Sequence, residues 1–491
     1  MRTATTIFHT WVATALATAL AGCAVGPQYV RPPAPAIILA SPQAAEFTAE
    51  SAVPAAWWRI FEDDGLGRWI ETALAHNHDI RQARASLLAA RAAFDERRLD
   101  RLPGVTSGAG YTRGIQQQAS NGGARTLSES WQAGFDVQWE IDLFGRLDRL
   151  QEAAMARAEA SQAELELTRQ SIAAEVARTW FEAQGDRRQL EVARREADNW
   201  RETVRLAQAR LRAGAGLPED VENAQANLLR SEAAIPPLTA SLQQARHRLD
   251  VLAGRRPGQG GLPDPGHAQA APLAARLPLG DVNRLILARP DVAQAERLLA
   301  ASVEDVGAAT ADLYPRIDLG GFLGFFALRD GDFGSAASRA FQVAPTVTWP
   351  ALRLANARAR LRGAKALSDG ALARYEQVLL TAQEEVENAV THLAEQQRQL
   401  AALLQAGQHA QAAFDIADRR YRAGAGSYQA VLENQRTLFQ LRRQVAQQEA
   451  ISQARIVALY KALGWPVPSP GDVASLSAGP GRQDPGRDSG A

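Results

Sequence analysis

The chain has 491 residues, with 54 basic side chains, 54 acidic side chains and a single cysteine. Balanced charge argues against a protein that mainly grips nucleic acid, and one cysteine excludes a disulfide framework or a cysteine-rich metal site within one chain. Beyond the N-terminus, no apolar run approaches the ~20 residues of a membrane-spanning helix. The seven histidines show no metal-binding spacing, and phosphate-loop and G-x-S-x-G motifs are absent, so we expect no enzyme, no cofactor and no metal site.

The N-terminus has the pattern of a bacterial lipoprotein signal. The apolar segment at 11–22 has the length of a signal-peptide core, and the preceding charge is Arg2. Leu-Ala-Gly-Cys at 20–23 matches the lipoprotein box, which predicts cleavage after Gly22 and acylation of Cys23. The alternative is an ordinary signal peptide with an accidental cysteine. We expect a signal peptide over 1–22 and a lipid anchor with a Pro-rich tether over 23–56.

An internal repeat organises the rest of the chain. Asp79 and Pro103 recur 212 residues later, and Trp139 and Gly254 recur 210 residues later. A fixed offset over more than a hundred residues indicates a duplication. We expect four segments, which are a first repeat at 57–256, a Gly/Pro-rich linker at 257–280, a second repeat at 281–466 and a disordered tail at 467–491.

Each half contains a pair of predicted strands. Over 131–143, apolar residues alternate strictly with polar ones, and the apolar face carries Trp131, Phe135 and Trp139. The other expected strands lie at about 105–115, 316–328 and 341–349. One alternative is a half-buried sheet in a sandwich. However, these strands reach the ~9–11 residues of a transmembrane strand. Because four strands cannot close a barrel and open edges cannot lie in lipid, several chains would share one barrel.

Very long helices follow each strand pair. No proline occurs in 146–213, which as a helix would be about 100 Å long at ~1.5 Å per residue. Helices of this length must pack as coiled coils. We expect long helices over 146–213, 218–254, 351–423 and 428–464, with a bend at Pro236. The predicted fold is mostly α, with long coiled-coil helices and four strands per chain.

The same turn sequence, Arg-Ala-Gly-Ala-Gly, joins the helices of each half. Gly214 and Gly424 are suited to left-handed helix ends. We expect both turns at the end of the helices that is far from the strands. Their candidate residues are Arg212, Gly214, Gly216, Arg422, Gly424 and Gly426.

An ordered set of motifs resembles the outer-membrane efflux factor family, the TolC/OprM/NodT group. The set comprises the lipoprotein box followed by GPQYVRPP, the string WEIDLFGR at 139–146, the two glycine turns, Ile-Pro at 235–236 and Arg-Pro-Asp at 289–291. The resemblance covers about 25–466. It implies a homotrimer with a twelve-stranded barrel in the outer membrane of a Gram-negative bacterium and a helical barrel that extends into the periplasm.

The resemblance also implies partners and a function. The helical turns would meet a periplasmic adaptor protein, and the adaptor would meet an inner-membrane pump of the RND type. The chain would be the outer-membrane channel of a tripartite efflux system, a passive gated duct for drugs, small toxic compounds or metal ions. Two alternatives stay open, a type I protein-secretion channel and a periplasmic coiled-coil scaffold lipoprotein. Four long alternating strands argue against the scaffold, and the lipoprotein box favours efflux.

Gate residues follow from the same resemblance. Asp220 and Tyr421 match a family pair that latches the aperture, and a phenol donating to a carboxylate makes a strong hydrogen bond. Glu433 matches an acidic constriction position, whereas Gly426 stands where the family often has a charged lock residue. The alternative is that Asp220 is a first-turn acid favoured by the helix dipole and Tyr421 is a packing residue.

Overall fold

The computed structural model describes residues 25–33, 38–43, 47, 56–117, 125–260 and 280–468. The predicted cleavage and acylation at Gly22 and Cys23, most of the linker and all but two residues of the tail lie outside these ranges. The chain divides into two compact units. Unit 1 is formed by Met1–Pro33, Ser86–Gln162 and Gln294–Gln377, and unit 2 by Ala34–Ala85, Ala163–Ala293 and Val378–Ala491.

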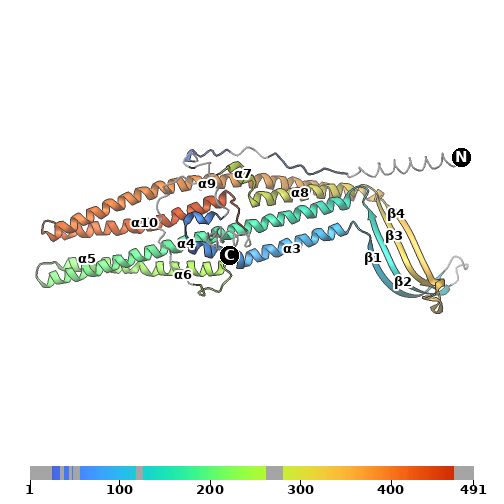
Figure 1. Ribbon diagram of the computed structural model, residues 1–491, viewed down its shortest axis with the longest axis horizontal. Helices are drawn as coiled ribbons and strands as arrows, with labels where there is room; N and C mark the ends of the chain where they lie inside the picture. The colour runs from blue at the N-terminus through green and yellow to red at the C-terminus, as the bar shows by residue number, and fades with distance from the viewer. Residues whose placement is uncertain are drawn as a thin grey trace, which may run out of the picture. The chain divides into compact units, whose positions relative to one another are not determined.

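Unit 1 contains a four-stranded antiparallel sheet in the order β1-β2-β3-β4 (Figure 1). The strands are β1 (Gly104–Gln117), β2 (Arg125–Ile141), β3 (Arg316–Ala327) and β4 (Arg339–Thr348). Two short 3-10 turns, Asp330–Asp332 and Ala336–Ser338, lie between β3 and β4, and a third, Ala351–Arg353, follows β4. The combination of four strands with very long helices confirms the predicted fold class.

Strand β2 begins six residues earlier and ends two residues earlier than the predicted range of 131–143. It begins earlier because Arg125 already pairs with β1. The alternation pattern does not extend over this part of the strand, because Glu129 is a charged residue on the apolar face. Glu129 pairs there with Arg113 at 3.1 Å. The strand ends at Ile141 because the Asp142 carboxylate accepts from the backbone N–H of Asp148, 2.8 Å away, in the first turn of the next helix.

Small side chains let the helices of unit 1 pack closely. This unit contains the ends of α3 (His78–Leu99) and α8 (Pro290–Ala311), together with the first parts of α4 (Arg146–Arg212) and α9 (Leu354–Arg422). Its core includes Ala156, Ala300 and Ala301, against which Tyr29 packs. The closely packed helices also enclose an ion pair, in which Arg149 and Glu304 are both buried and lie 2.7 Å apart.

Unit 2 consists of two helical hairpins and a layer of short helices. The first hairpin joins α4 to α5 (Pro218–Ala233) and α6 (Ile235–Leu252), and the second joins α9 to α10 (Tyr428–Ala462). The short elements are η2 (Trp57–Phe61), α2 (Asp64–His76) and α7 (Val282–Leu287). The Trp57 ring stacks on Tyr460 with centroids 5.9 Å apart, which ties η2 to α10 in the core.

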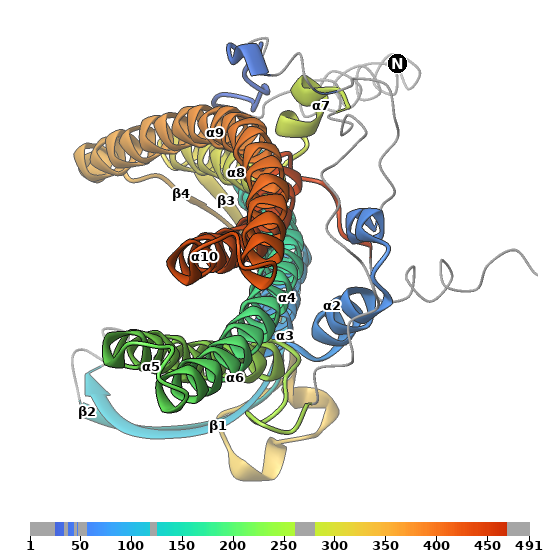
Figure 2. The same cartoon turned by 90° about the vertical axis from the view of Figure 1, so that its left-hand side faces the viewer.

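Helices α4 and α10 lie side by side in unit 2 (Figure 2). Arg188 on α4 donates to Glu449 on α10 at 3.1 Å. Gly185 on α4 also faces Ala450 on α10, so closely that a Cβ on the glycine would lie 2.5 Å from the alanine Cβ. A glycine is therefore required at position 185 for this helix packing.

The helix predicted over 218–254 is divided in two, at the predicted bend. Pro236 and Pro237 occupy the first turn of α6, where a missing backbone N–H costs little. At the break, the N–H of Ala234 bonds to Ser231, three residues back. Helix α10 runs over 35 residues without a comparable interruption. No helix within the described ranges is both long enough and apolar enough to cross a membrane.

Candidate functional site

The sheet has one apolar face that continues across all four strands. Directly opposed residues in an antiparallel sheet share a face, so the pairing register sorts the side chains. Trp131 lies opposite Tyr111 and Ala327, and Phe135 lies opposite Ser107 and Leu323. The face is completed mainly by Val105, Ala109, Ile115, Leu127, Ala133, Val137, Trp139, Ile141, Ile317, Leu319, Phe325, Phe341, Val343 and Val347.

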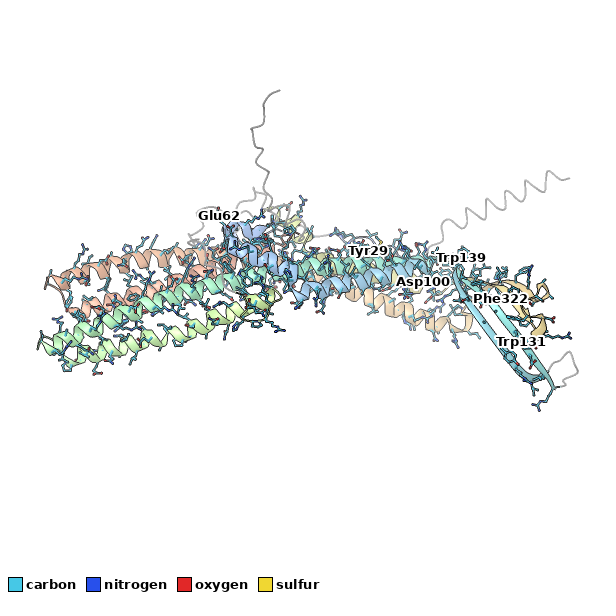
Figure 3. The ribbon with its side chains drawn as sticks, turned by 60° about the horizontal axis from the view of Figure 1, so that its bottom comes forward. Tyr29, Glu62, Asp100, Trp131, Trp139 and Phe322 are labelled. Atoms are coloured by element: carbon cyan, nitrogen blue, oxygen red, sulfur yellow. The ribbon has the colours of Figure 1, made fainter. Side chains whose placement is uncertain are left out.

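Many side chains on this face are exposed within the single chain. The exposed fractions are 81% for Phe341, 65% for Leu323 and 55% for Phe135. Figure 3 labels Trp131 and Trp139 toward opposite ends of β2. The Trp139 indole N–H donates to the carbonyl of Arg101 at 3.0 Å, so the polar group of this side chain has a hydrogen-bond partner. An apolar surface of this kind marks a contact with a membrane or another protein.

The opposite face of the sheet is mostly polar or small. It carries Asp136, Gln138 and Glu140 on β2, and Asp318 lies directly opposite Glu140. Phe322 (Figure 3) is an exception, because its ring covers the directly opposed Gly134 and Gly324. A Cβ on Gly134 would lie 2.8 Å from the Phe322 ring. The two faces therefore differ in chemistry along the whole sheet.

At the other candidate region, both glycine turns have the same backbone geometry. Gly214 has a φ of 70° and Gly424 a φ of 73°, which are left-handed values that favour glycine. The following alanines close the turns, since Ala215 N–H bonds to the carbonyl of Arg210 and Ala425 N–H to that of Arg420, both at 2.9 Å. The structure thus places two equivalent turns at the hairpin ends.

The other predicted turn residues surround these glycines. Arg212 and Arg422 are exposed, and Arg422 pairs with Asp418 at 2.9 Å in its own helix. Gly216 and Gly426 lie against the last helical turns, where an added Cβ would approach backbone atoms to about 3.0–3.1 Å.

The predicted gate residues Asp220 and Tyr421 do not bond to each other among the described residues. The Asp220 carboxylate accepts from the backbone N–H of Leu217 at 3.4 Å, which is the role of a first-turn acid in α5. The Tyr421 hydroxyl accepts from Arg210, and the Arg210 guanidinium lies 5.4 Å from the Tyr421 ring centroid. The sequence reasoning missed Arg210, which lies 210 residues before another arginine, Arg420.

Tyr428 is a second residue that the sequence reasoning missed. Its ring centroid is 5.3 Å from that of Tyr421, and its hydroxyl faces the carbonyl of Thr203 at 3.5 Å. Burial raises the pKa of Tyr428 to about 12, with smaller contributions in the same direction from Tyr421 and Asp220. Asp220 therefore lies close enough to Tyr428 to act on it electrostatically.

Glu433 lies about one turn into α10 and is exposed. It accepts from the side-chain amide of Gln429 at 3.1 Å. Its role at a constriction stays a prediction. Groups of three or more His, Cys, Asp or Glu side chains that could hold a metal are absent from the part of the chain that is described.

Comparison with known proteins gives matches over nearly the whole chain. A family model described as outer membrane efflux protein matches residues 69–255 and 282–465. The outer membrane protein OprJ of Pseudomonas aeruginosa is 30% identical over 452 residues, which cover 91% of this chain and 94% of OprJ. The solvent efflux pump outer membrane protein SrpC of Pseudomonas putida is 28% identical over 473 residues, which cover 91% of this chain and 97% of SrpC. The solved outer-membrane channel OprN has a TM-score of 0.85 and 38% identity, covering 90% of this chain and all of that one.

Proposed function

The chain belongs to the outer membrane efflux protein family, and on that premise we propose that it is the outer-membrane channel of a tripartite efflux system. It is a passive duct in the outer membrane of a Gram-negative bacterium. Its cargo comprises drugs, solvents and other small toxic compounds, or metal ions. The energy for transport comes from an inner-membrane pump of the RND type, which a periplasmic adaptor protein connects to this chain.

The observation that carries the proposal is a sheet with one continuous apolar face and two open edges. Within the described ranges, β1 pairs only with β2, and β4 pairs only with β3. The apolar face suits lipid, yet unpaired backbone groups at an edge cannot remain there. Three copies with four strands each would join β1 of one copy to β4 of the next and close a twelve-stranded barrel.

A lipid anchor at Cys23 fits the contacts of the segment that follows it. The Val25 N–H donates to the carbonyl of Phe144 at 3.2 Å, at the junction between β2 and α4. The Tyr29 hydroxyl donates to Glu296 on α8, and the Arg297 guanidinium lies 5.7 Å from the Tyr29 ring centroid. These contacts would hold an acylated Cys23 close to the sheet, where its chains can enter the membrane.

The duplication is also part of the proposal, and two pairs of equivalent contacts support it. The indole N–H of Trp139 donates to the Arg101 carbonyl, and that of Trp349 donates to the Leu313 carbonyl at 3.2 Å. In the same way, Asn77 donates to the carbonyl of Leu252, and Arg289 donates to that of Ala462. In both pairs of contacts, the residue in the first half of each offset pair (Arg101 or Asn77) lies 212 residues before its equivalent, and its partner (Trp139 or Leu252) lies 210 residues before its equivalent.

The test combines assembly and conductance of the full-length lipoprotein. We expect SDS-resistant, heat-modifiable trimers in the outer-membrane fraction and ion conductance in planar bilayers. A chain that stays soluble after removal of its acyl chains and conducts no ions would contradict the proposal.

A matched pair of variants tests the assignment of the faces. Leu323→Arg places a charge on the apolar face, at a cost of ~2–4 kcal/mol per copy near the bilayer midplane. The control, Gln342→Arg, places the same charge on the polar face of the neighbouring strand. We expect Leu323→Arg to abolish outer-membrane trimers and Gln342→Arg to retain them. Equal trimer yields would show that the apolar face does not contact lipid.

A further inference from the structure

A cavity of about 560 Å³ lies between three helices of unit 2. Helix α4 runs between α6 and α10 (Figure 2) and presents one face, from Arg178 to Gln189, to the cavity. Two contacts tie α4 to α6 along it, because Asp186 accepts from Ser241 at 2.5 Å and Glu175 accepts from Arg248 at 3.3 Å. The volume is within the range of ~300–1,000 Å³ that small-molecule sites have.

Small apolar residues form much of the cavity wall. Gly185 lines the cavity from α4, and the other apolar lining residues are Ala245, Ala450, Ile451, Ala454 and Ala458. Because most of these residues have no side chain beyond a Cβ, the space between the helices stays open to the apolar part of a ligand.

The two acidic residues that line the cavity already have donors. The Glu182 carboxylate accepts from Arg178, which also pairs with Glu175 at 2.8 Å. The Asp186 carboxylate accepts from Ser241. A cationic ligand would therefore have to displace an existing partner from either carboxylate.

Two donors that line the cavity have no partner. Thr179 is 2% exposed, and its hydroxyl makes no hydrogen bond within the described residues. Arg455 is partly buried, and neither a hydrogen bond nor an ion pair engages its guanidinium in the part of the chain that is described. A buried hydroxyl is usually hydrogen-bonded, and a guanidinium presents a fork of donors that matches a carboxylate.

These two donors lie at a similar height along the helices. Helices α4 and α10 run antiparallel. Counted from the contact between Gly185 and Ala450, Thr179 lies six residues back along α4 and Arg455 lies five residues forward along α10. Both donors therefore lie in the same direction from that contact, where one ligand can reach them.

We propose that this cavity binds a small organic anion, a molecule that joins a carboxylate to an apolar body. The carboxylate pairs with the guanidinium of Arg455 and accepts a hydrogen bond from the hydroxyl of Thr179. The apolar body lies against the alanines of α6 and α10. The site is formed within one chain, so the proposal goes beyond the channel function and does not depend on it.

Isothermal titration calorimetry of the full-length protein in lipid nanodiscs tests the site, with 2-naphthoate as the probe. We expect one molecule to bind per chain, and 2-naphthamide, which has the same rings but no charge, to bind about tenfold more weakly. Arg455→Gln should weaken 2-naphthoate about tenfold and change 2-naphthamide less than about twofold, whereas Arg455→Lys should stay within about threefold of wild type. Thr179→Val, which removes the hydroxyl at nearly the same volume, should weaken 2-naphthoate about threefold.

The matched control is Arg246→Gln on α6. Arg246 is also partly buried and without a partner among the described residues, but it does not line the cavity. Its substitution should leave the affinity for 2-naphthoate unchanged. Equal affinities for wild type and Arg455→Gln, or no saturable binding in the millimolar range, would overturn the proposal. Tighter binding of 2-naphthylmethylammonium than of 2-naphthoate would overturn it as well, since it would assign the site to the carboxylates.

A second measurement locates the bound anion. Ala454→Cys places a thiol on the cavity wall, whereas His247→Cys places one on an exposed position of α6 outside the cavity. Saturating 2-naphthoate should slow maleimide labelling about tenfold at position 454 and leave the rate at position 247 unchanged. Equal rates at position 454 with and without 2-naphthoate would overturn the site. Both measurements report binding rather than conductance, so a negative result leaves the channel function untouched, and a chain that binds 2-naphthoate but conducts no ions would keep the site and lose the channel.

Discussion

The two helical hairpins carry the same turn sequence but use it differently. Arg210 and Arg420 are equivalent by the repeat offset, yet Arg210 reaches across to Tyr421 whereas Arg420 bonds to the Ala425 carbonyl of its own turn at 3.4 Å. The residue equivalent to Tyr421 in the first hairpin is Leu211, which has no group to accept a hydrogen bond. Within the described residues, the Arg210–Tyr421 contact therefore has no equivalent made by Arg420.

The returning arms of the hairpins also differ. The first arm is broken at Ala234, whereas the second arm, α10, is continuous and packs along α4. The two hairpins thus have the same turn sequence and first helices of similar length, while a few positions that differ between them give each hairpin its own bend and its own contacts. The predictions below test whether those positions cause the difference.

The largest effect should come from moving the break into the second hairpin. Ala446 is equivalent to Pro236 and is 6% exposed within α10. A proline there removes a backbone hydrogen bond and clashes with the preceding turn, so Ala446→Pro should destabilise the chain by ~3 kcal/mol or more. The thermal unfolding midpoint of the purified protein measures this loss.

Pro236→Ala is the matched control in the first hairpin. The Pro236 ring already occupies a first turn, so its removal should change stability by less than ~1 kcal/mol. If both variants shift the unfolding midpoint equally, the break is not what distinguishes the two returning arms.

The fold could be predicted largely from the sequence, because each element leaves a local pattern. Alternation over 131–143 and the lack of proline over 146–213 predicted β2 and α4, and Pro236 predicted the bend between α5 and α6. The start of β2 could not be predicted, since the Arg113–Glu129 pair interrupts the apolar alternation while lying on the same face.

The helical end of the candidate site was harder to predict, because it depends on how the helices are rotated about their axes. Nothing in the sequence distinguishes Arg210 from Arg420, and only the packing shows that Arg210 faces Tyr421. Asp220 matched a known pattern, but the backbone of its own helix start competes for its carboxylate. Residues that act across a helix interface therefore cannot be identified from the spacing of residue types along the sequence.

A smaller effect should come from the helix starts that follow the two turns. The Ser427 hydroxyl accepts from the Ala430 N–H at 3.2 Å and caps α10, whereas Leu217 has no side-chain acceptor for α5. Ser427→Ala should destabilise by ~1 kcal/mol, and Leu217→Ser should stabilise by up to ~1 kcal/mol. Hydrogen exchange of the amides in the first turns of α5 and α10 measures both changes. Faster exchange in both variants would show that capping does not distinguish the hairpin ends.

The smallest effect concerns Tyr428, and it should be visible only at high pH. Burial raises the pKa of Tyr428 from about 10 to about 12, so the folded state keeps the phenol neutral where the unfolded state ionises. Its contribution to stability is complete below pH ~10 and is lost as the pH rises toward and through 12. The unfolding midpoints of wild type and Tyr428→Phe should therefore differ by a constant amount up to pH ~10, above which wild type should lose stability faster. Tyr460, whose pKa burial also raises to about 12, is present in both proteins and cancels from the comparison. A midpoint difference that stays constant from pH 8 to 11.5 would mean that Tyr428 is not buried at the hairpin end, and it would remove one of the contacts by which the second hairpin differs from the first.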